Sequence, residues 1–304
     1  MSYSKGKYLL LLMATLALSG CSDLELLNPK GSVGEQEKNL ILLSMGVMLC
    51  VVIPVVALSL FFAWHYRASN PNAKHDPTWH HSTAIEIVVW GIPIAIVAFL
   101  GWRIWVTTHA LDPYRKLDSA AAAVEVDVVA LNWKWLFIYP QYGVATVNVL
   151  NIPVNRPINF HLTSDSNMNS FFIPQLGSQI YAMAGMETQL HLMGTEVGTY
   201  PGRSTAFSGP GFSGMHFPAH VQTDEQFNAW VKDAHNSTNA LDDTAYLALR
   251  KDSEDNPETV YGSVKSELFQ AITTQYDCTQ ENSLRREGDV SHCTQSGSVV
   301  MENH

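Results

Sequence analysis

One carboxylate lies inside an otherwise apolar stretch of the chain, where proton chemistry is the first function to consider. Residues 85–106 are almost entirely apolar, with Glu86 near one end of the run and Arg103 near the other. Ionisable side chains within membrane spans mark ion or proton pathways by default. We expect Arg103 to extend to the lipid headgroups, and Glu86 either to be hydrated at the membrane surface or to serve as a proton-entry group. Imidazole is suited to proton exchange near neutral pH, so the preceding His80 and His81 are either proton collectors or inert loop residues.

A cysteine near the start of the chain predicts lipid attachment. Lys5 and Lys7 precede an apolar stretch, and Ser19 and Gly20 stand immediately before Cys21. A charged, then apolar, then small-residue order is typical of a secretory signal. The local string LSGC resembles a bacterial lipoprotein box, so we interpret residues 1–20 as a lipoprotein signal peptide and Cys21 as the lipidated residue. An ordinary signal peptide with an incidental cysteine is the alternative.

Two apolar runs predict two transmembrane helices, at about residues 40–64 and 85–106. No charged side chain occurs between residues 39 and 64. A helix of ~20 apolar residues crosses the ~30 Å hydrocarbon core of a bilayer. Both runs therefore meet the length requirement for a span, and the segment at 21–38 precedes them.

The loop between the two runs predicts their orientation. It carries Arg67 and Lys74, and only Asp76 opposes them. A positively charged short loop belongs on the cytoplasmic side. A lipidated Cys21 lies on the other side, so two independent signals place the chain from about residue 110 outside the cytoplasm. We expect a bacterial inner-membrane protein with a periplasmic C-terminal domain.

Composition separates the membrane part from the rest. Hydrophobic residues make up 46% of the 304 residues and charged residues only 15%, against a globular average of about 25% charged. Residues 110–304 hold 22 of the 28 acidic residues but 11 of the 18 basic ones. This balance excludes a simple soluble enzyme, and it argues against a nucleic-acid partner, which requires a basic surface.

Alternating valines predict the first strand of a β-domain. Val124, Val126 and Val128 alternate with acidic residues, the period-two pattern of a half-buried strand. Glycine and proline turn signals separate further strand-like stretches, as is typical of a sandwich or small barrel. These stretches are residues 145–150, 158–163, 179–183, 187–193 and 215–221. We therefore expect an all-β sandwich over residues 110–222.

A short helical extension is predicted after the sandwich, over residues 223–304. Residues 223–226 read TDEQ, a capping box that begins a helix. Residues 241–251 and 263–276 predict further short helices, and the polar tail follows. Cys278 and Cys293 would stand in an oxidising compartment, where they either pair as a disulfide or remain free thiols.

Three stretches resemble subunit II of haem–copper terminal oxidases. They are NWKWLFIYP at residues 132–140, the motif from TSD to SFFIPQLG at 163–177, and residues 202–215. The resemblance covers about residues 35–235 and includes two spans before a β-domain. It implies that the predicted sandwich is cupredoxin-like.

The resemblance also implies that a copper site has been lost. Cytochrome c oxidases of this family hold a dinuclear copper centre with two thiolates, two imidazoles, a thioether and a backbone carbonyl, because soft sulfur and imidazole ligands suit copper. The family motif places these ligand positions here at Asn169, Ser204, Ala206, Ser208, Phe212 and Met215. Both thiolate positions hold serine and neither imidazole position holds histidine, so the Met215 thioether alone survives among the side-chain ligands. We therefore expect no metal in this chain.

Other soft ligands offer little to replace that site. His216 and His220 lie four residues apart in an extended stretch and can point the same way. The remaining candidates are scattered along the sequence. They are His161, His191, Met168, Met183, Met186 and Met193. We expect surface or packing roles for them rather than a second copper site.

Residues 169–186 and 208–215 are similar to the bo-type, quinol-oxidising branch of the family. That similarity implies a proton-pumping ubiquinol:oxygen oxidoreductase of the aerobic respiratory chain in which this chain performs no redox step. Haems and the oxygen-site copper would belong to subunit I, the direct partner, with subunits III and IV and membrane lipid as further partners and no soluble cytochrome c. Trp133 and Trp135 would then pack rather than pass electrons. Glu86 matches the family position at the mouth of a proton channel into subunit I.

Two other functions remain open from the sequence. One is a copper-bearing cytochrome c oxidase subunit II, opposed by the substitutions at the ligand positions. The other is a stand-alone, membrane-anchored cupredoxin-like lipoprotein. Two predicted spans plus a lipid are more anchorage than such a tether needs.

Overall fold

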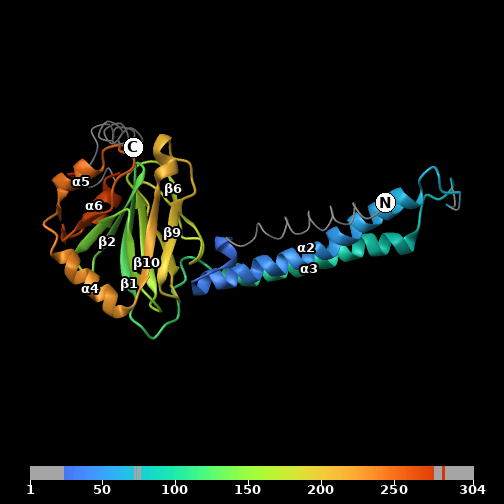
Figure 1. The fold of residues 1–304 in the computed structure, drawn as a ribbon, viewed down its shortest axis with the longest axis horizontal. Helices are drawn as coiled ribbons and strands as arrows, with labels where there is room; N and C mark the ends of the chain where they lie inside the picture. Colours follow the sequence, from blue (N-terminus) through green and yellow to red (C-terminus); the bar gives the residue numbers. More distant parts are fainter. Residues whose placement is uncertain (1–23, 72, 74–76, 277–282, 285–304) are drawn as a thin grey trace, which may run out of the picture. The chain divides into compact units, whose positions relative to one another are not determined.

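The computed structural model describes residues 24–71, 73, 77–276 and 283–284 (Figure 1). The chain divides into two compact units. Residues 36–115 form one unit, which consists mainly of helices. The residues before them and those from 116 onward form the other, which is built on β-sheets. The short segment that precedes the first long helix therefore belongs with the sandwich.

Two long helices account for the helical unit. Helix α2 (Ser32–His65) has 34 residues and α3 (Thr83–Ala110) has 28. At about 1.5 Å per residue, each is long enough to cross a ~30 Å hydrocarbon core. No residue in the most apolar stretch of each helix is buried in the single chain, so lipid or another protein must cover it. The two predicted spans are confirmed as helices, and each helix is longer than the apolar run that predicted it.

Two sheets form the predicted β-sandwich. The first has the strand order β12-β3-β2-β1-β5-β8 and the second the order β4-β10-β9-β6-β7. Most neighbouring strands are antiparallel, but β1 pairs with β5, and β4 with β10, in parallel. The strands are β1 (Val124–Leu131), β2 (Lys134–Tyr139), β3 (Val144–Val147), β4 (Leu150–Pro153), β5 (Ile158–Ser164), β6 (Asn169–Phe172), β7 (Ile180–Ala182), β8 (Thr188–Leu192), β9 (Gly198–Ser204), β10 (His216–Gln222) and β12 (Thr259–Tyr261). The all-β sandwich that the sequence predicts is confirmed.

Aromatic side chains fill the space between the two sheets. Phe171 and Phe217 of the second sheet stack with their ring centroids 5.5 Å apart. Trp135 of the first sheet meets Phe171 edge-on at 5.4 Å. All three side chains are fully buried, and each aromatic pair adds about 1 kcal/mol beyond the burial of its area. Trp135 therefore serves as a core residue that joins the sheets.

One predicted strand is two strands in the structure. The sequence predicts a single strand over residues 145–150, but β3 and β4 lie in different sheets. Asn148, between them, has a φ of 55°, which interrupts an extended strand. Its Oδ1 accepts a 2.8 Å hydrogen bond from the backbone N–H of Trp135. This turn carries the chain from one sheet to the other.

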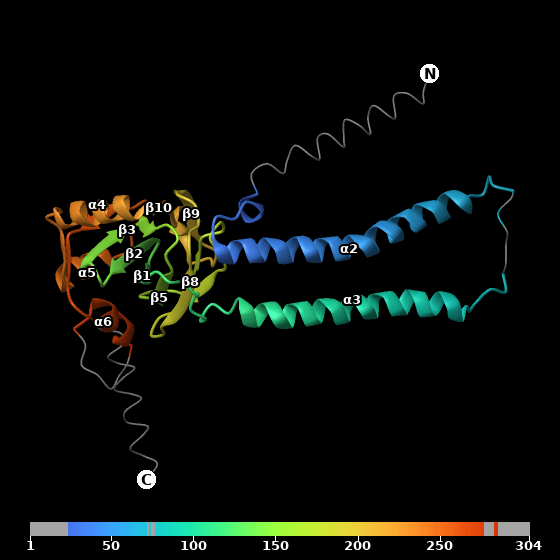
Figure 2. The ribbon, with the colours of Figure 1, turned by 90° about the horizontal axis from the view of Figure 1, so that it is seen from below.

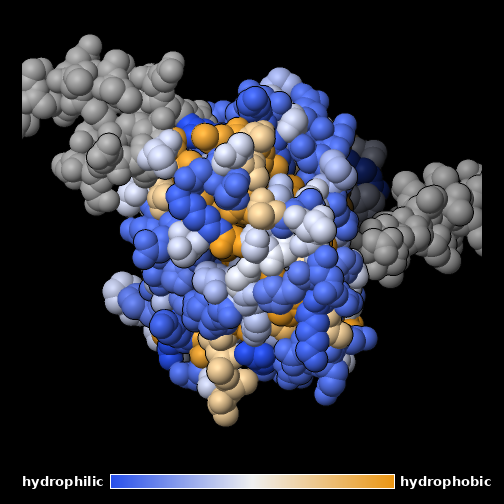
Figure 3. Space-filling model, turned by 90° about the vertical axis from the view of Figure 1, so that its left-hand side faces the viewer, coloured by the Kyte–Doolittle hydropathy of each residue, from blue (hydrophilic) through white to orange (hydrophobic). Residues whose placement is uncertain are grey.

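The C-terminal extension packs against the outer face of the first sheet (Figure 2). Tyr246 and Leu268 of the extension join Val129 and Leu136 of the sheet in one buried cluster. Strand β12 pairs with β3, so the extension also completes the edge of that sheet. Its other elements are α4 (Asp224–His235), β11 (Ala240–Leu241), α5 (Asp243–Leu249), β13 (Ser263–Val264) and α6 (Leu268–Thr274). The face on this side is mostly hydrophilic, with small separate apolar patches (Figure 3).

The extension confirms one local prediction and corrects another. Thr223 and Gln226 form the predicted capping box at the start of α4, each side chain bonded to the other's backbone N–H. The helix predicted over residues 263–276 is wrong in its first part, which forms β13. Glu267 has a φ of 60° and stands immediately before α6. This left-handed residue separates the strand from the shorter helix.

The segment before α2 lies along the sandwich. Gly31 forms a β-bridge with Gly194. The backbone N–H of Lys30 donates to the Gln175 carbonyl at 2.6 Å, and the N–H of Thr195 donates to the Lys30 carbonyl at 2.8 Å. Lys30 also forms an ion pair with a glutamate of the sandwich, Glu196. The entry to the first long helix is thus fastened to the β-unit.

Candidate functional site

The positions aligned with copper ligands gather where two loops of the second sheet meet. Asn169 begins β6, Ser204 ends β9 and Met215 precedes β10. All three side chains are buried. The Ser204 hydroxyl donates a 3.2 Å hydrogen bond to Oδ1 of Asn169. The backbone N–H of Ser204 donates to the Met215 carbonyl at 3.1 Å. The structure therefore brings these three predicted positions together.

The other aligned positions lie along the loop between β9 and β10. The carbonyl of Ala206 is 3.3 Å from the Ser204 hydroxyl. The carbonyl of Ser208 accepts a 3.1 Å hydrogen bond from the indole N–H of Trp133. The buried Ser208 hydroxyl has no hydrogen-bond partner among the described residues. Phe212 is half-buried and packs against the neighbouring ring of Phe207, 5.6 Å away.

These residues do not fit a copper pair. The site offers an amide, hydroxyls and one thioether, whereas copper prefers thiolate and imidazole ligands. The Asn169 amide is already used, since its Nδ2 donates to the Asn167 carbonyl at 2.9 Å and its Oδ1 accepts from Ser204. Within the described ranges, no group of three or more His, Cys, Asp or Glu side chains is placed to hold a metal ion. The positions that the resemblance aligns with copper ligands form a small hydrogen-bonded contact between loops.

The four histidines of the sandwich are divided between its two sheets. His161 and His191 lie on β5 and β8 of the first sheet, and His216 and His220 on β10 of the second. His220 is 2.9 Å from the Thr199 hydroxyl through its Nδ1. The fold does not bring the four imidazoles together as one ligand set.

A titratable cluster that the sequence did not reveal lies on the outer face of the first sheet. His161 approaches Glu187 at 2.7 Å and Glu125 at 3.1 Å. Burial lowers the pKa of His161, but the two carboxylates outweigh it and the net shift is upward. Burial raises the pKa of Asp127 to about 7, with His161 opposing the rise and the two glutamates adding to it. The alternation of side chains along β1 places Glu125 and Asp127 on this face. The parallel pairing of β1 with β5, which brings His161 beside these two residues, is not visible in the sequence.

Glu86 lies in the first turn of α3. Its side chain is 57% exposed, and its Oε1 is 3.3 Å from Nδ1 of His81. The first turn of a helix favours a carboxylate, because the unpaired N–H groups there carry partial positive charge. Nδ1 of His80 is 2.6 Å from the Thr78 carbonyl, so the two predicted proton collectors differ in their contacts.

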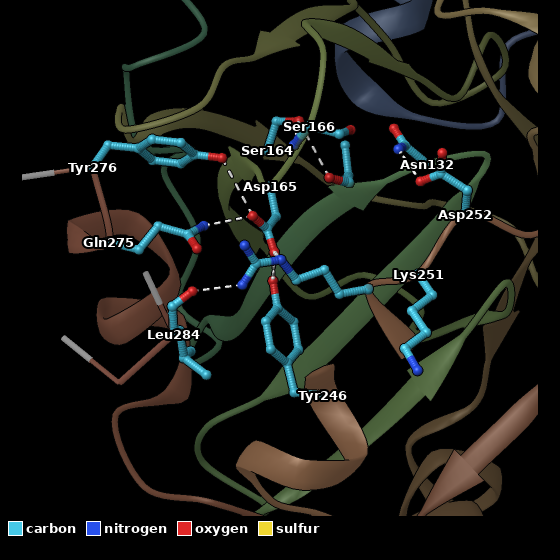
Figure 4. A network of polar contacts seen from close by, with 12 residues as sticks. Asn132, Ser164, Asp165, Ser166, Tyr246, Lys251, Asp252, Gln275, Tyr276 and Leu284 are labelled. Carbon is cyan, nitrogen blue, oxygen red and sulfur yellow. Dashed lines mark hydrogen bonds and ion pairs between the residues drawn. The ribbon is translucent and has the colours of Figure 1, made fainter. Parts of the chain in front are cut away.

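A second unpredicted group is a fully buried carboxylate, Asp165, in the loop after β5 (Figure 4). Its Oδ2 accepts a 2.5 Å hydrogen bond from the Tyr246 hydroxyl and lies 3.2 Å from Nε of Arg250. Its Oδ1 accepts from Gln275 at 2.6 Å and from Tyr276 at 3.3 Å. Every one of these partners comes from the C-terminal extension. Asp165 belongs to the TSD stretch that carries the family resemblance. No local pattern predicts these partners of its carboxylate, which are at least 81 residues away in the sequence.

All three cysteines with a predicted modification or pairing lie outside the described residues. These are the lipidation site Cys21 and the pair Cys278 and Cys293. Cys50 is described, and it is an exposed free cysteine on α2. The lipid and the disulfide therefore stay predictions.

The chain is similar to known proteins in its extension and along most of its length. The COX Aromatic Rich Motif matches residues 235–277 of the extension. The chain is 52% identical over 265 residues to cytochrome bo(3) ubiquinol oxidase subunit 2 of Pseudomonas putida, covering 87% of this chain and 84% of that protein. It is 50% identical over 268 residues to ubiquinol oxidase subunit 2 of Acetobacter aceti, covering 88% and 87%.

Among solved structures, the sandwich is similar to the periplasmic domain of subunit II of cytochrome oxidase from Bradyrhizobium japonicum. The TM-score is 0.35 and the identity 21%, over 36% of this chain and 91% of that domain. The relatives of known sequence, by contrast, cover most of this chain and most of their own length at half identity or better. On that sequence evidence, the chain belongs to the ubiquinol oxidase subunit 2 family of the bo type.

Proposed function

We propose that this chain is the non-redox subunit 2 of a proton-pumping ubiquinol:oxygen oxidoreductase in the aerobic respiratory chain. The relatives above are named as subunit 2 of ubiquinol oxidases. The observation that carries the proposal is the chemistry at Asn169, Ser204 and Ser208, where an amide and two hydroxyls replace an imidazole and two thiolates. Electrons then enter the complex from ubiquinol in the membrane, and the outer domain relays none.

A copper-bearing cytochrome c oxidase subunit is the competing function. It would need soft ligands at the meeting point of the two loops. Asn169 and Ser204 are instead hydrogen-bonded to each other. A stand-alone lipoprotein is the other competing function, and it is opposed by the relatives, which are named as subunits of ubiquinol oxidases.

The proposal implies direct contact with subunit I, which would hold the haems and the oxygen-site copper, and association with subunits III and IV. An affinity tag on this chain should therefore recover a haem-bearing subunit from detergent-solubilised membranes. The purified assembly should consume oxygen with ubiquinol and fail to oxidise a reduced soluble cytochrome c. Recovery of the chain alone, or oxidation of the cytochrome, would refute the assignment.

Copper binding gives an independent test on this chain alone. The full-length chain in detergent, incubated with copper and then desalted, should retain no stoichiometric copper and show no purple or blue absorption. A stoichiometric coloured centre would return electron transfer from a cytochrome as the leading function.

Glu86 is proposed to collect protons at the cytoplasmic mouth of a path into subunit I. Its exposure, its place in the first turn of α3 and the imidazole of His81 at 3.3 Å all support this role. A solvated carboxylate can take a proton from water, and a neighbouring imidazole can exchange one near neutral pH.

Replacing this carboxylate tests the proposal. Glu86→Gln should slow ubiquinol-driven oxygen reduction several-fold in the assembled complex without loss of the bound haem. Glu35→Gln is the matched control, since Glu35 is an exposed acid in the first turn of α2. Wild-type turnover in Glu86→Gln across neutral pH would exclude a proton-entry role.

Localisation is proposed to be the bacterial inner membrane, with the sandwich in the periplasm and a lipid on Cys21. Mass spectrometry of the mature chain should find Cys21 as an acylated first residue, and Cys21→Ser should abolish acylation, with Cys50→Ser as the control. Differential alkylation of the same sample should show whether Cys278 and Cys293 form the predicted disulfide. An unmodified Cys21 would disprove the lipid anchor while leaving the subunit assignment intact.

A further inference from the structure

We propose that residues 250–256 of the C-terminal extension, here called the brace segment, act as an intramolecular clamp on three loops at one end of the sandwich. The loops are the β1–β2 turn at residues 132–133, the β5–β6 loop at 165–168 and the β9–β10 loop at 205–215. The β9–β10 loop carries four of the positions aligned with copper ligands, and the other two, Asn169 and Ser204, lie in the strands that adjoin the β5–β6 and β9–β10 loops. The brace segment contacts all three.

The β5–β6 loop is held by a buried ion pair. Nε of Arg250 lies 3.2 Å from Oδ2 of Asp165, with the two side chains 10% and 0% exposed. Arg250 also donates to the Leu284 carbonyl at 2.5 Å. The Tyr246 hydroxyl, the Gln275 amide and the Tyr276 hydroxyl also donate to the carboxylate. A buried carboxylate with this many donors is costly to expose or to leave unpaired, so it fixes the loop against the extension.

The β1–β2 turn is held by two side chains that reach the brace segment. Lys134 is 1% exposed, and its Nζ donates to the Lys251 carbonyl at 2.8 Å and to the Ser253 hydroxyl. Nδ2 of Asn132 donates to the carboxylate of Asp252 (Figure 4). Burial lowers the pKa of Lys134, and Asp252 opposes that shift. An ammonium group out of contact with water needs these acceptors.

The β9–β10 loop is pressed between the β1–β2 turn and the brace segment. A Cβ added at Gly211 would lie 2.6 Å from the Trp133 ring and 2.8 Å from Cγ of Glu254. A Cβ added at Gly214 would lie 3.1 Å from Oδ1 of Asp255. Only a residue without a side chain allows so close an approach at Gly211. The loop is thus enclosed on two sides.

The contacts of the brace segment add to the direct hydrogen bonds that join the ends of β6 and β9. The side chains aligned with ligands contribute the hydrogen bond from Ser204 to Asn169, and the backbone contributes the bond from Thr205 N–H to the Ser170 carbonyl, 3.1 Å long. A metal bound by both loops would cross-link them directly. Here a segment of the chain that is anchored by α5 and β12 on either side makes the link from outside. This assigns a function to part of the region that matches the COX Aromatic Rich Motif.

Hydrogen exchange of the full-length chain in detergent tests the clamp. Arg250→Met should accelerate backbone exchange about tenfold in both the 165–168 and 205–215 loops, because loss of the buried ion pair frees the first loop directly and loosens the brace segment that encloses the second. Lys265→Met is the matched control, since Lys265 pairs with Asp243 on the same extension but is exposed and lies away from the three loops. Arg250→Lys should fall between wild type and Arg250→Met.

Faster exchange in both loops with an unchanged core of β1 and β5 would support the clamp. Faster exchange confined to residues 240–276 would overturn it. If Arg250→Met does not fold, Asn132→Ala replaces it, because it removes one hydrogen bond to Asp252 from a partly exposed site. That variant should accelerate exchange in the 205–215 loop at an unchanged melting temperature, and a wild-type exchange rate there would equally overturn the clamp.

Discussion

The hydroxyl of Ser204 donates a 3.2 Å hydrogen bond to the amide oxygen of Asn169, which stands 35 positions earlier in the sequence. Both side chains are buried. The family resemblance predicts a thiolate and an imidazole at these two positions in copper-bearing members. In this chain the two side chains form a neutral hydrogen bond between the end of β9 and the start of β6.

Removing this donor should destabilise the sandwich. Ser204→Ala leaves the buried Oδ1 of Asn169 without its partner, which should lower the free energy of unfolding by about 1–2 kcal/mol. Ser208→Ala is the control, since the Ser208 hydroxyl makes no hydrogen bond within the described residues, and it should change that free energy by about 0.5 kcal/mol or less. Urea unfolding of the full-length chain in detergent measures both. Equal losses in the two variants would show that the Ser204–Asn169 bond contributes nothing.

The attachment of the extension should depend strongly on Tyr246. Its hydroxyl donates at 2.5 Å to the buried carboxylate of Asp165. Burial raises the pKa of Tyr246 well above its ordinary value, so it remains a donor. Tyr246→Phe should cost about 1.5–3 kcal/mol, the range for a hydrogen bond to a charged group. Tyr276→Phe removes a longer contact of 3.3 Å to the same carboxylate and should cost less in the same unfolding assay. A larger loss in Tyr276→Phe would contradict this order.

The stability of the sandwich should fall as pH rises through neutrality. Burial raises the pKa of Asp127 from 3.8 to about 7, so the folded chain binds this proton more tightly than the unfolded chain. The stabilisation is complete below the unfolded value and is lost as pH rises through about 7. The raised pKa of His161, which faces Asp127, Glu125 and Glu187, acts in the same direction above 6.5.

Asp127→Asn should remove part of this dependence. Melting temperatures between about pH 5 and 8 should decline less steeply in the variant, corresponding to about 1 kcal/mol after allowance for solvent screening of a partly exposed group. Glu258→Gln changes an exposed carboxylate and should keep the wild-type profile. A wild-type slope in Asp127→Asn would disprove the contribution of this carboxyl.

The segment before α2 should depend on the absence of a side chain at Gly31. A Cβ there would lie 2.4 Å from the backbone carbonyl oxygen of Leu176. Backbone cannot move aside cheaply, so Gly31→Ala should detach this segment and make residues 24–35 more sensitive to protease. Gly46→Ala is the matched control, since an added Cβ meets nothing within 4 Å. Equal resistance of residues 24–35 to protease in both variants would show that the segment does not need the close approach of Gly31 to Leu176.

Local patterns predicted the elements well. The two apolar runs became α2 and α3, and the alternating valines became β1, because length and hydrophobic periodicity act within one element. The capping box at Thr223 formed because its two hydrogen bonds join residues three apart. Predictions failed where one residue changes the backbone direction. Asn148 and Glu267, both with positive φ, divided stretches that the sequence presented as continuous.

Residue types and their spacing were enough to predict which elements form and which part of the chain is apolar enough to cross a membrane. These properties depend on residue type and on spacing within short segments. Packing across the whole fold, by contrast, brings Asp165 to Arg250 and brings His161 to Glu125 and Glu187. Such contacts join residues that are 26 to 85 positions apart, and they depend on strand order and on how the extension packs. Strand order and the packing of the extension leave no periodic signal in the sequence, because burial and pairing across a fold are set by all of its elements together.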